Sequence, residues 1–115
     1  MFNLLSAVEY AHSLGIIHRD IKLQNILVGK EIYDVYLADF GFSTTEKSSD
    51  LQLGTPGYMA PEIFLGEYTN KIDVFSTGIV MFILLTGQHP FADKNQNRHD
   101  ILVRNIIGDI KMPID

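Results

Sequence analysis

The chain has 115 residues, of which 46% are hydrophobic and 20% are charged, and its formal net charge is -5. This composition is ordinary for one small globular domain and excludes a disordered or fibrous chain. The acidic net charge and the lack of a Lys/Arg run argue against nucleic acid or a membrane surface as partner. The absence of cysteine excludes disulfides and thiolate metal sites and fits a reducing compartment, so we expect an intracellular, cytoplasmic protein.

Hydrophobic spacing predicts a first helix over residues 2–14. Leu4, Val8 and Ala11 recur at helical intervals, and the pattern stops at Gly15, which we expect to form the C-terminal cap. The N-terminus has no cationic region ahead of an apolar one, so the sequence indicates neither a secretory signal nor a transit peptide.

Short β-branched and apolar segments predict strands at 16–17, 26–28 and 35–37. The first two flank a polar stretch, 18–25, and a turn at 29–31 separates the second from the third. Short strands are therefore expected on both sides of the residues that carry chemistry.

The remaining chain predicts one exposed loop and three helices. The loop covers 44–53, where the sequence turns polar, and Pro61 can open a short helix through Leu65 that Gly66 ends. Residues 70–85 predict a core helix that is apolar almost all round and needs cover on nearly every side, and because the chain has few elements to supply it, we expect part of the apolar surface to lack cover. The helix is too short for the ~20 residues of a membrane span. The last helix is amphipathic and ends at Gly108, with Ile101, Leu102, Ile106 and Ile107 opposite Asp100, Arg104 and Asn105.

Three motifs follow one another along the chain: His18-Arg19-Asp20-Ile21-Lys22-Leu23-Gln24-Asn25, Asp39-Phe40-Gly41, and Gly54-Thr55-Pro56-Gly57-Tyr58-Met59-Ala60-Pro61-Glu62. In this order they resemble the catalytic loop, the metal-binding turn and the substrate-facing loop of eukaryotic-type serine/threonine protein kinases. The resemblance implies an α+β, mainly α fold: a fragment of the larger, C-terminal lobe with short β-hairpins around the catalytic loop. It also implies transfer of the terminal phosphate of ATP to protein Ser and Thr hydroxyls.

Each requirement of phosphate transfer has a residue in these motifs. Asp20 would accept the hydrogen bond and then the proton of the substrate hydroxyl, and Lys22 can reach the transferred phosphate. Asn25 and Asp39 offer the hard oxygen ligands that Mg²⁺ prefers. The resemblance places Leu27, together with Lys22, Asn25 and Asp39, at the nucleotide, so ATP and Mg²⁺ are the expected cofactors.

Other residues are expected to support the site rather than react. The resemblance stacks His18 with Phe40, which packs away from water, and Gly41 supplies a backbone that can take unusual dihedrals. It also implies that Asp73, at the start of the long helix, anchors the backbone of the catalytic loop with a supporting hydrogen bond from His12. An N-terminal helix charge favoured by the helix dipole is the alternative for Asp73.

The resemblance pairs Arg19 with a phosphate that an upstream kinase places on the activation segment. Asp50, next to Leu51 near the usual position, is a candidate for a built-in negative charge in place of that phosphate. The candidate acceptors are Thr44, Thr45, Ser48 and Ser49.

Lys22 and the segment that contains Thr55 resemble serine/threonine rather than tyrosine kinases. In that resemblance Thr55 bridges Asp20 and Lys22, and Tyr58 shapes the pocket for the residue after the acceptor. Glu62 closes the loop and is expected to be buried without the arginine that normally neutralises it.

The resemblance covers residues 1–115 as a partial protein kinase domain. Leu23 stands where many relatives have Pro, and Phe75 where many have Trp, which leaves the chemical residues intact. The glycine-rich strands, the phosphate-anchoring lysine and the last helices of the lobe have no counterpart in the chain. We therefore expect the isolated chain to be marginally stable and inactive. The alternatives are a truncated, pseudokinase-like binding or decoy module and a small-molecule kinase of related architecture.

Overall fold

The computed structural model describes residues 2–31, 34–45, 54–65, 68–91, 101 and 103–105. Its regular elements are the helices α1 (Phe2–Ser13) and α2 (Lys71–Thr86), the strands β1 (Ile26–Val28) and β2 (Val35–Leu37), and the 3-10 helices η1 (Leu23–Asn25), η2 (Phe40–Phe42) and η3 (Pro61–Leu65). The predicted fold class, mainly helical with a short hairpin, is confirmed.

Helix α1 ends where the sequence predicts. Gly15 adopts a left-handed φ of 77°, and its N–H donates to the carbonyl of His12 at 3.0 Å. The N–H of Ile16 reaches back to the carbonyl of Ala11 at 2.9 Å, so the two bonds form the double C-terminal cap that a glycine at this position favours.

Strands β1 and β2 form an antiparallel hairpin over the residues that the sequence predicts. Its register pairs Ile26 with Leu37 and Val28 with Val35. The strand predicted at 16–17 is wrong. Only Ile17 takes part in pairing, through an isolated bridge to Thr44. The backbone turns into the 18–25 loop directly after this bridge, so no second residue can extend the ladder.

Helix α2 follows the predicted core helix to within a residue at either end, and Gly87 caps it with a φ of 73°. In the described part of the chain its apolar surface is only partly covered, as expected for a chain with few elements to wrap it, because Val74 and Leu85 are 59% and 78% exposed. Its buried face carries polar groups as well as Ile72 and Val80. Among the described residues, no helix has the length and apolar character needed to cross a membrane.

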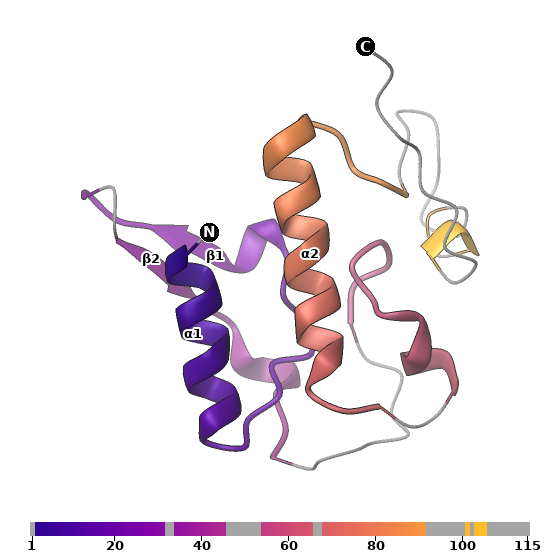
Figure 1. The fold of residues 1–115 in the computed structure, drawn as a ribbon, viewed down its shortest axis with the longest axis horizontal. Coiled ribbons are helices and arrows are strands. Elements are labelled where there is room, and N and C mark those ends of the chain that lie inside the picture. The colour runs from indigo at the N-terminus through magenta and orange to yellow at the C-terminus, as the bar shows by residue number, and fades with distance from the viewer. Residues whose placement is uncertain are drawn as a thin grey trace.

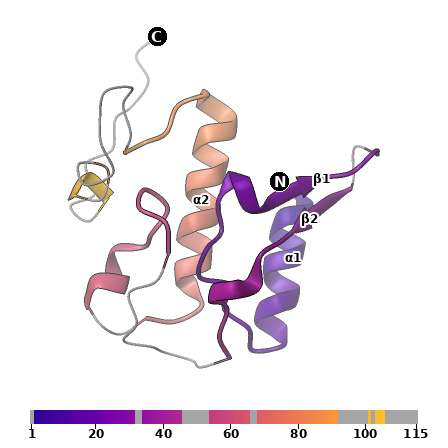
Figure 2. The same ribbon diagram turned by 180° about the vertical axis from the view of Figure 1, so that it is seen from behind.

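The hairpin and α1 lie on one side of α2, and the 54–65 segment lies on the other (Figures 1 and 2). Two apolar clusters fill the spaces between them, and Phe75 of α2 packs against both. The first comprises Leu4, Val8, Ile21, Tyr58, Ile79, Val80 and Phe91, and the second Ile17, Met59, Ala60, Ile63, Tyr68 and Ile72. Because Ile21 lies within the first cluster at 0% exposure, the core fixes the 18–25 loop from inside.

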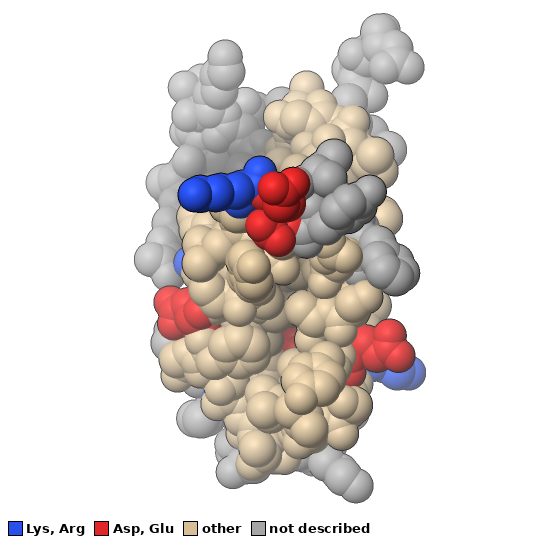
Figure 3. Space-filling view, turned by 90° about the vertical axis from the view of Figure 1, so that its left-hand side faces the viewer, with Lys and Arg blue, Asp and Glu red and all other residues tan. Residues whose placement is uncertain are grey.

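The face of the molecule on the hairpin side carries few charges. Figure 3 shows its Lys, Arg, Asp and Glu side chains in small separate groups, with most of the visible described surface bearing neither sign. This face therefore does not present a continuous electrostatic field of one sign.

Candidate active site

Two side chains, one from the 18–25 loop and one from the 54–62 loop, meet at Asp20. The hydroxyl of Thr55 donates to Oδ1 of Asp20 at 2.6 Å, and Nζ of Lys22 donates to the same hydroxyl at 3.0 Å. The Lys22 ammonium also lies 3.9 Å from Oδ2 of Asp20. Thr55 thus bridges the carboxylate and the cation, which is the contact that the resemblance implies.

Asn25 joins Asp20 to the end of the hairpin. Its buried amide donates to the Asp20 carbonyl at 2.8 Å and lies 3.4 Å from the carboxylate Oδ2. The carbonyl of Asn25 in turn accepts the N–H of Ala38 at 2.8 Å, one step beyond the paired strands. Asp39 directly follows Ala38, so the hairpin brings the two expected metal ligands, Asn25 and Asp39, to the same end.

Asp73 anchors the backbone of the 18–25 loop through hydrogen bonds. Its carboxylate is 1% exposed and accepts the N–H of His18 at 2.8 Å and the N–H of Arg19 at 3.0 Å. Nε2 of His12 lies 2.8 Å from the same carboxylate. Asp73 also stands in the first turn of α2, so both interpretations given for it from the sequence apply.

Two non-glycine residues of the site have left-handed backbones, Arg19 with a φ of 71° and Asp39 with a φ of 56°. The expectation that Gly41 supplies the unusual dihedral is wrong, because the left-handed residue is Asp39 itself. Gly41 instead leaves space for the Asp39 side chain. A Cβ at Gly41 would lie 3.1 Å from Oδ1 of Asp39, which accepts the Gly41 N–H. Such strain persists only where surrounding bonds hold it, and Asp73 does so at Arg19.

His18 is a packed residue at 1% exposure, as expected. Nδ1 accepts the N–H of Asp20 at 3.0 Å, so Nε2 is left to donate to the carbonyl of Ala38 at 2.9 Å. The ring packs edge-on against Phe40 at 4.6 Å. Phe40 is nevertheless 42% exposed, which corrects the expectation that it packs away from water.

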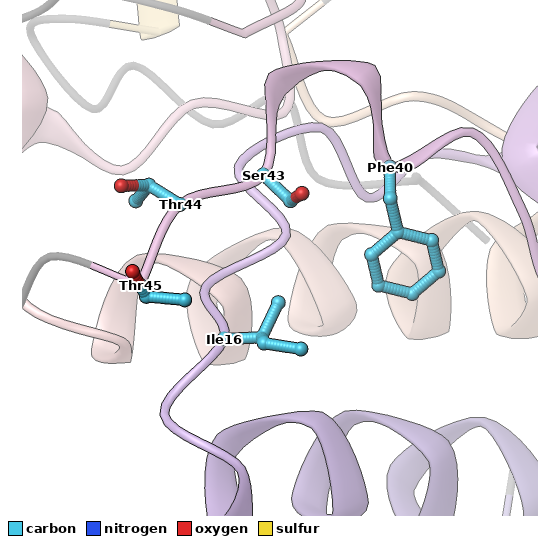
Figure 4. Close-up of a pocket in the computed structure, with 5 residues that line it drawn as sticks. All are labelled: Ile16, Phe40, Ser43, Thr44 and Thr45. Carbon is cyan, nitrogen blue, oxygen red and sulfur yellow. The ribbon is translucent and has the colours of Figure 1, made fainter.

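A hollow of about 530 Å³ opens beside Phe40 (Figure 4). It is lined by Ile16, Phe40, Ser43, Thr44 and Thr45. Two of the candidate phosphate acceptors therefore line it, whereas Asp20 and Lys22 do not, so this hollow is separate from the network around Asp20.

The 54–62 loop contains a tight turn closed by the bond from the Tyr58 N–H to the Thr55 carbonyl at 3.1 Å. Gly57 has a φ of 98°, and a Cβ there would lie 2.7 Å from the His89 ring, so only glycine fits. Tyr58 is buried in the first apolar cluster, against which Leu23 of the 18–25 loop packs. The 54–62 loop therefore meets the 18–25 loop through this cluster as well as through Thr55.

Burial shifts two groups of this loop region in opposite directions. It raises the pKa of the Tyr58 phenol, an effect that the polar backbone of Leu23 partly offsets. It lowers the pKa of His89, which packs edge-on against Tyr58 at 5.1 Å. Both pKa shifts favour the neutral form of the side chain.

Sequence reasoning missed Asn105, which we placed on the solvent face of the last helix. It is 0% exposed, and its side chain bonds the backbone of Gly57 and Met59. The spacing carried a signal, because Asn105 lies four residues after Ile101 and so shares its helix face. The rest of that predicted helix beyond Asn105 lies outside the described residues.

The other predicted residues are placed as follows. Leu27 is 52% exposed on β1, and Glu62, in η3, is partly rather than fully buried, which corrects the expectation for its carboxylate. Arg19 donates to the hydroxyl of Tyr68 at 3.2 Å. Ser48, Ser49, Asp50 and Leu51 lie outside the described residues.

A catalytic-type aspartate bridged to a lysine, beside an asparagine and an aspartate at a hairpin end, is the arrangement of a protein kinase lobe. A family model described as the protein kinase domain matches residues 1–114, so the chain belongs to the protein kinase family. Over 97% of its length it is 39% identical to the probable serine/threonine-protein kinase KCC4 of Saccharomyces cerevisiae. Over 89% it is 44% identical to calcium-dependent protein kinase 5 of Plasmodium berghei, and over 83% it is 40% identical to human serine/threonine-protein kinase H1.

The chain spans 11% of the yeast relative, 19% of the Plasmodium relative and 24% of the human one. The match therefore shows the family and the type of domain.

Proposed function

We propose that this chain supplies the catalytic and substrate loops of a serine/threonine protein kinase, which transfers the terminal phosphate of ATP to Ser and Thr hydroxyls of proteins. The observation that carries the proposal is the bridge from Thr55 to Asp20 and Lys22, at 2.6 and 3.0 Å. A binding or decoy module would have no need of this network. The lack of cysteine supports an intracellular location.

In the proposed reaction Asp20 accepts a hydrogen bond from the substrate hydroxyl and holds its proton at a carboxylate oxygen once the phosphate has moved. Thr55 and Asn25 keep that carboxylate from rotating, which fixes the direction in which it accepts. Lys22 places a positive charge where negative charge develops.

The oxygen donors present fit a magnesium–nucleotide complex. Asn25 offers an amide oxygen and Asp39 a carboxylate, and the described residues contain no cluster of three His, Cys, Asp or Glu side chains that would hold a metal ion alone. Mg²⁺ is commonly held by one or two carboxylates together with phosphates and water, which matches this small set. When bound, the complex supplies the phosphate and neutralises its charge; Leu27 would lie beside the nucleotide.

We extend the proposal to control by phosphorylation, in which an upstream kinase modifies the segment that follows Asp39. Arg19 is held in the site by Asp73 and Tyr68 and is the proposed partner of that phosphate.

Peptide phosphorylation tests the proposal. In a polypeptide that contains this segment within its complete kinase domain, Mg²⁺ and ATP are expected to label matched peptides with a Ser or Thr acceptor and to leave the Tyr version at background. Labelling is expected to stop when Mg²⁺ is chelated. Equal labelling of the Tyr peptide would contradict the assigned specificity, and no labelling of any peptide together with retained peptide binding would favour the decoy module.

A further inference from the structure

The side-chain amide of Asn105 hydrogen-bonds the backbone of the 54–62 loop both as an acceptor and as a donor, as a peptide group would. Oδ1 accepts the N–H of Gly57 at 2.8 Å and the N–H of Met59 at 3.1 Å, and Nδ2 donates to the carbonyl of Met59 at 2.7 Å. One fully buried side chain thus satisfies three backbone groups that lie 46 to 48 residues away in the sequence.

With the bonds of Asn105, each backbone N–H group from 57 to 59 has a partner inside the protein. The intervening Tyr58 is held separately: its N–H donates to the Thr55 carbonyl, and its carbonyl accepts the Ser76 hydroxyl at 2.6 Å. Without Asn105, the N–H of Gly57 and both backbone groups of Met59 would lose their partner inside the protein. A buried backbone group without a partner is destabilising, so the loop would move to find other partners.

Movement at Gly57 would reach the reacting end of the same loop. Thr55, which holds Asp20, is only two residues from Gly57, and Tyr58 lies in the apolar cluster against which Leu23 of the 18–25 loop packs. The position of residues 57–59 therefore sets both the alignment of Thr55 and the shape of the surface around Tyr58.

We propose that Asn105 is a positioning residue for the protein substrate, which fixes the 57–59 backbone and so determines the preference for the residue that follows the phosphate acceptor. The inference rests on the proposed function and deepens it, because it assigns the control of substrate choice to a residue outside the three motifs. Asn105 itself touches neither the nucleotide nor the reacting atoms.

The test compares two peptides that differ only in the residue after the acceptor, in the complete kinase domain. The Asn105→Leu variant keeps a similar volume and loses all three bonds; we expect its kcat/KM for the preferred peptide to fall on the order of tenfold and the ratio between the two peptides to approach one. The KM for ATP should stay within about twofold. The Asn105→Asp variant retains both acceptor contacts and should show a smaller loss of the ratio.

A matched control separates positioning from general destabilisation. Ala11→Gly weakens α1 at a buried residue that belongs to neither apolar cluster, and it should lower activity toward both peptides equally if it lowers it at all. An unchanged peptide ratio in either folded Asn105 variant would overturn the inference while leaving the proposed function intact. Failure of the wild-type protein to phosphorylate any peptide would instead count against the function.

Hydrogen exchange gives a readout that does not require activity. In the Asn105→Leu variant the amides of Gly57 and Met59 should exchange faster relative to the amides of His18 and Arg19, which Asp73 protects, whereas Asn105→Asp keeps an acceptor for both and should change them less. If the Asn105→Leu variant does not fold, the Asn105→Asp variant decides, because it loses the donor to the Met59 carbonyl: an unchanged peptide ratio in that variant would overturn the inference.

Discussion

Replacement of Asp20 by Asn is expected to lower the rate of phosphate transfer by about 10²–10⁴-fold, the usual contribution of a positioned general base. The amide has nearly the same shape and can still meet Thr55, but it cannot take up the proton of the substrate hydroxyl. The KM for ATP should change by less than about twofold, because the proposed nucleotide contacts come from Lys22, Asn25, Leu27 and Asp39. Steady-state kinetics in the complete kinase domain measures both quantities.

Glu9→Gln provides the matched control for this substitution. It makes the same carboxylate-to-amide change at an exposed position of α1 and should leave kcat and KM unchanged. An Asp20→Asn variant with more than a tenth of the wild-type kcat would contradict the role assigned to Asp20, even if the protein proved to be a kinase.

The Asp73→Ala variant is expected to lose about 3 kcal/mol or more of unfolding free energy. Three donors, the N–H groups of His18 and Arg19 and the ring of His12, lose their acceptor inside the protein, and each buried group left unpaired costs about 1–3 kcal/mol. A loss of this size is a large fraction of the 5–15 kcal/mol typical of a whole domain. Denaturant or thermal unfolding of the complete domain measures it.

Val74→Ala, one residue further along α2, tests whether this loss comes from the bonds rather than from the helix. Val74 is 59% exposed, so its truncation should change stability by no more than about 0.5 kcal/mol. If Asp73→Ala and Val74→Ala proved equally mild, Asp73 would be a helix-end charge and not the anchor of the 18–25 loop.

Local signals were sufficient for much of the fold. The end of α1 at Gly15, the hairpin of β1 and β2, and the extent of α2 each depend on residues close together in the sequence, and the structure agrees there. The short segment 16–17 did not become a strand, because a strand also needs a partner, and Thr44 offers one residue only.

The parts of the site that the motifs name, and the support from Asp73 and His12, were expected from the sequence, whereas the support from Asn105 was not. The motif Asp39-Phe40-Gly41 suggested an unusual glycine backbone, but the left-handed residue is Asp39, which no composition rule favours over the neighbouring glycine. Asn105 was assigned to solvent because it is polar. Its spacing of four residues from Ile101 indicated the buried face, but the two backbone positions that it bonds lie 46 and 48 residues earlier, which local spacing does not identify.

The most direct test is a crystal structure of the complete kinase domain with Mg²⁺ and a non-hydrolysable ATP analogue. We predict that the side-chain oxygens of Asn25 and Asp39 coordinate magnesium at about 2.0–2.1 Å and that Asp20 faces the terminal phosphate across the same site. A cation bound without Asn25 and Asp39, or an Asp20 carboxylate directed away from that phosphate, would contradict the account.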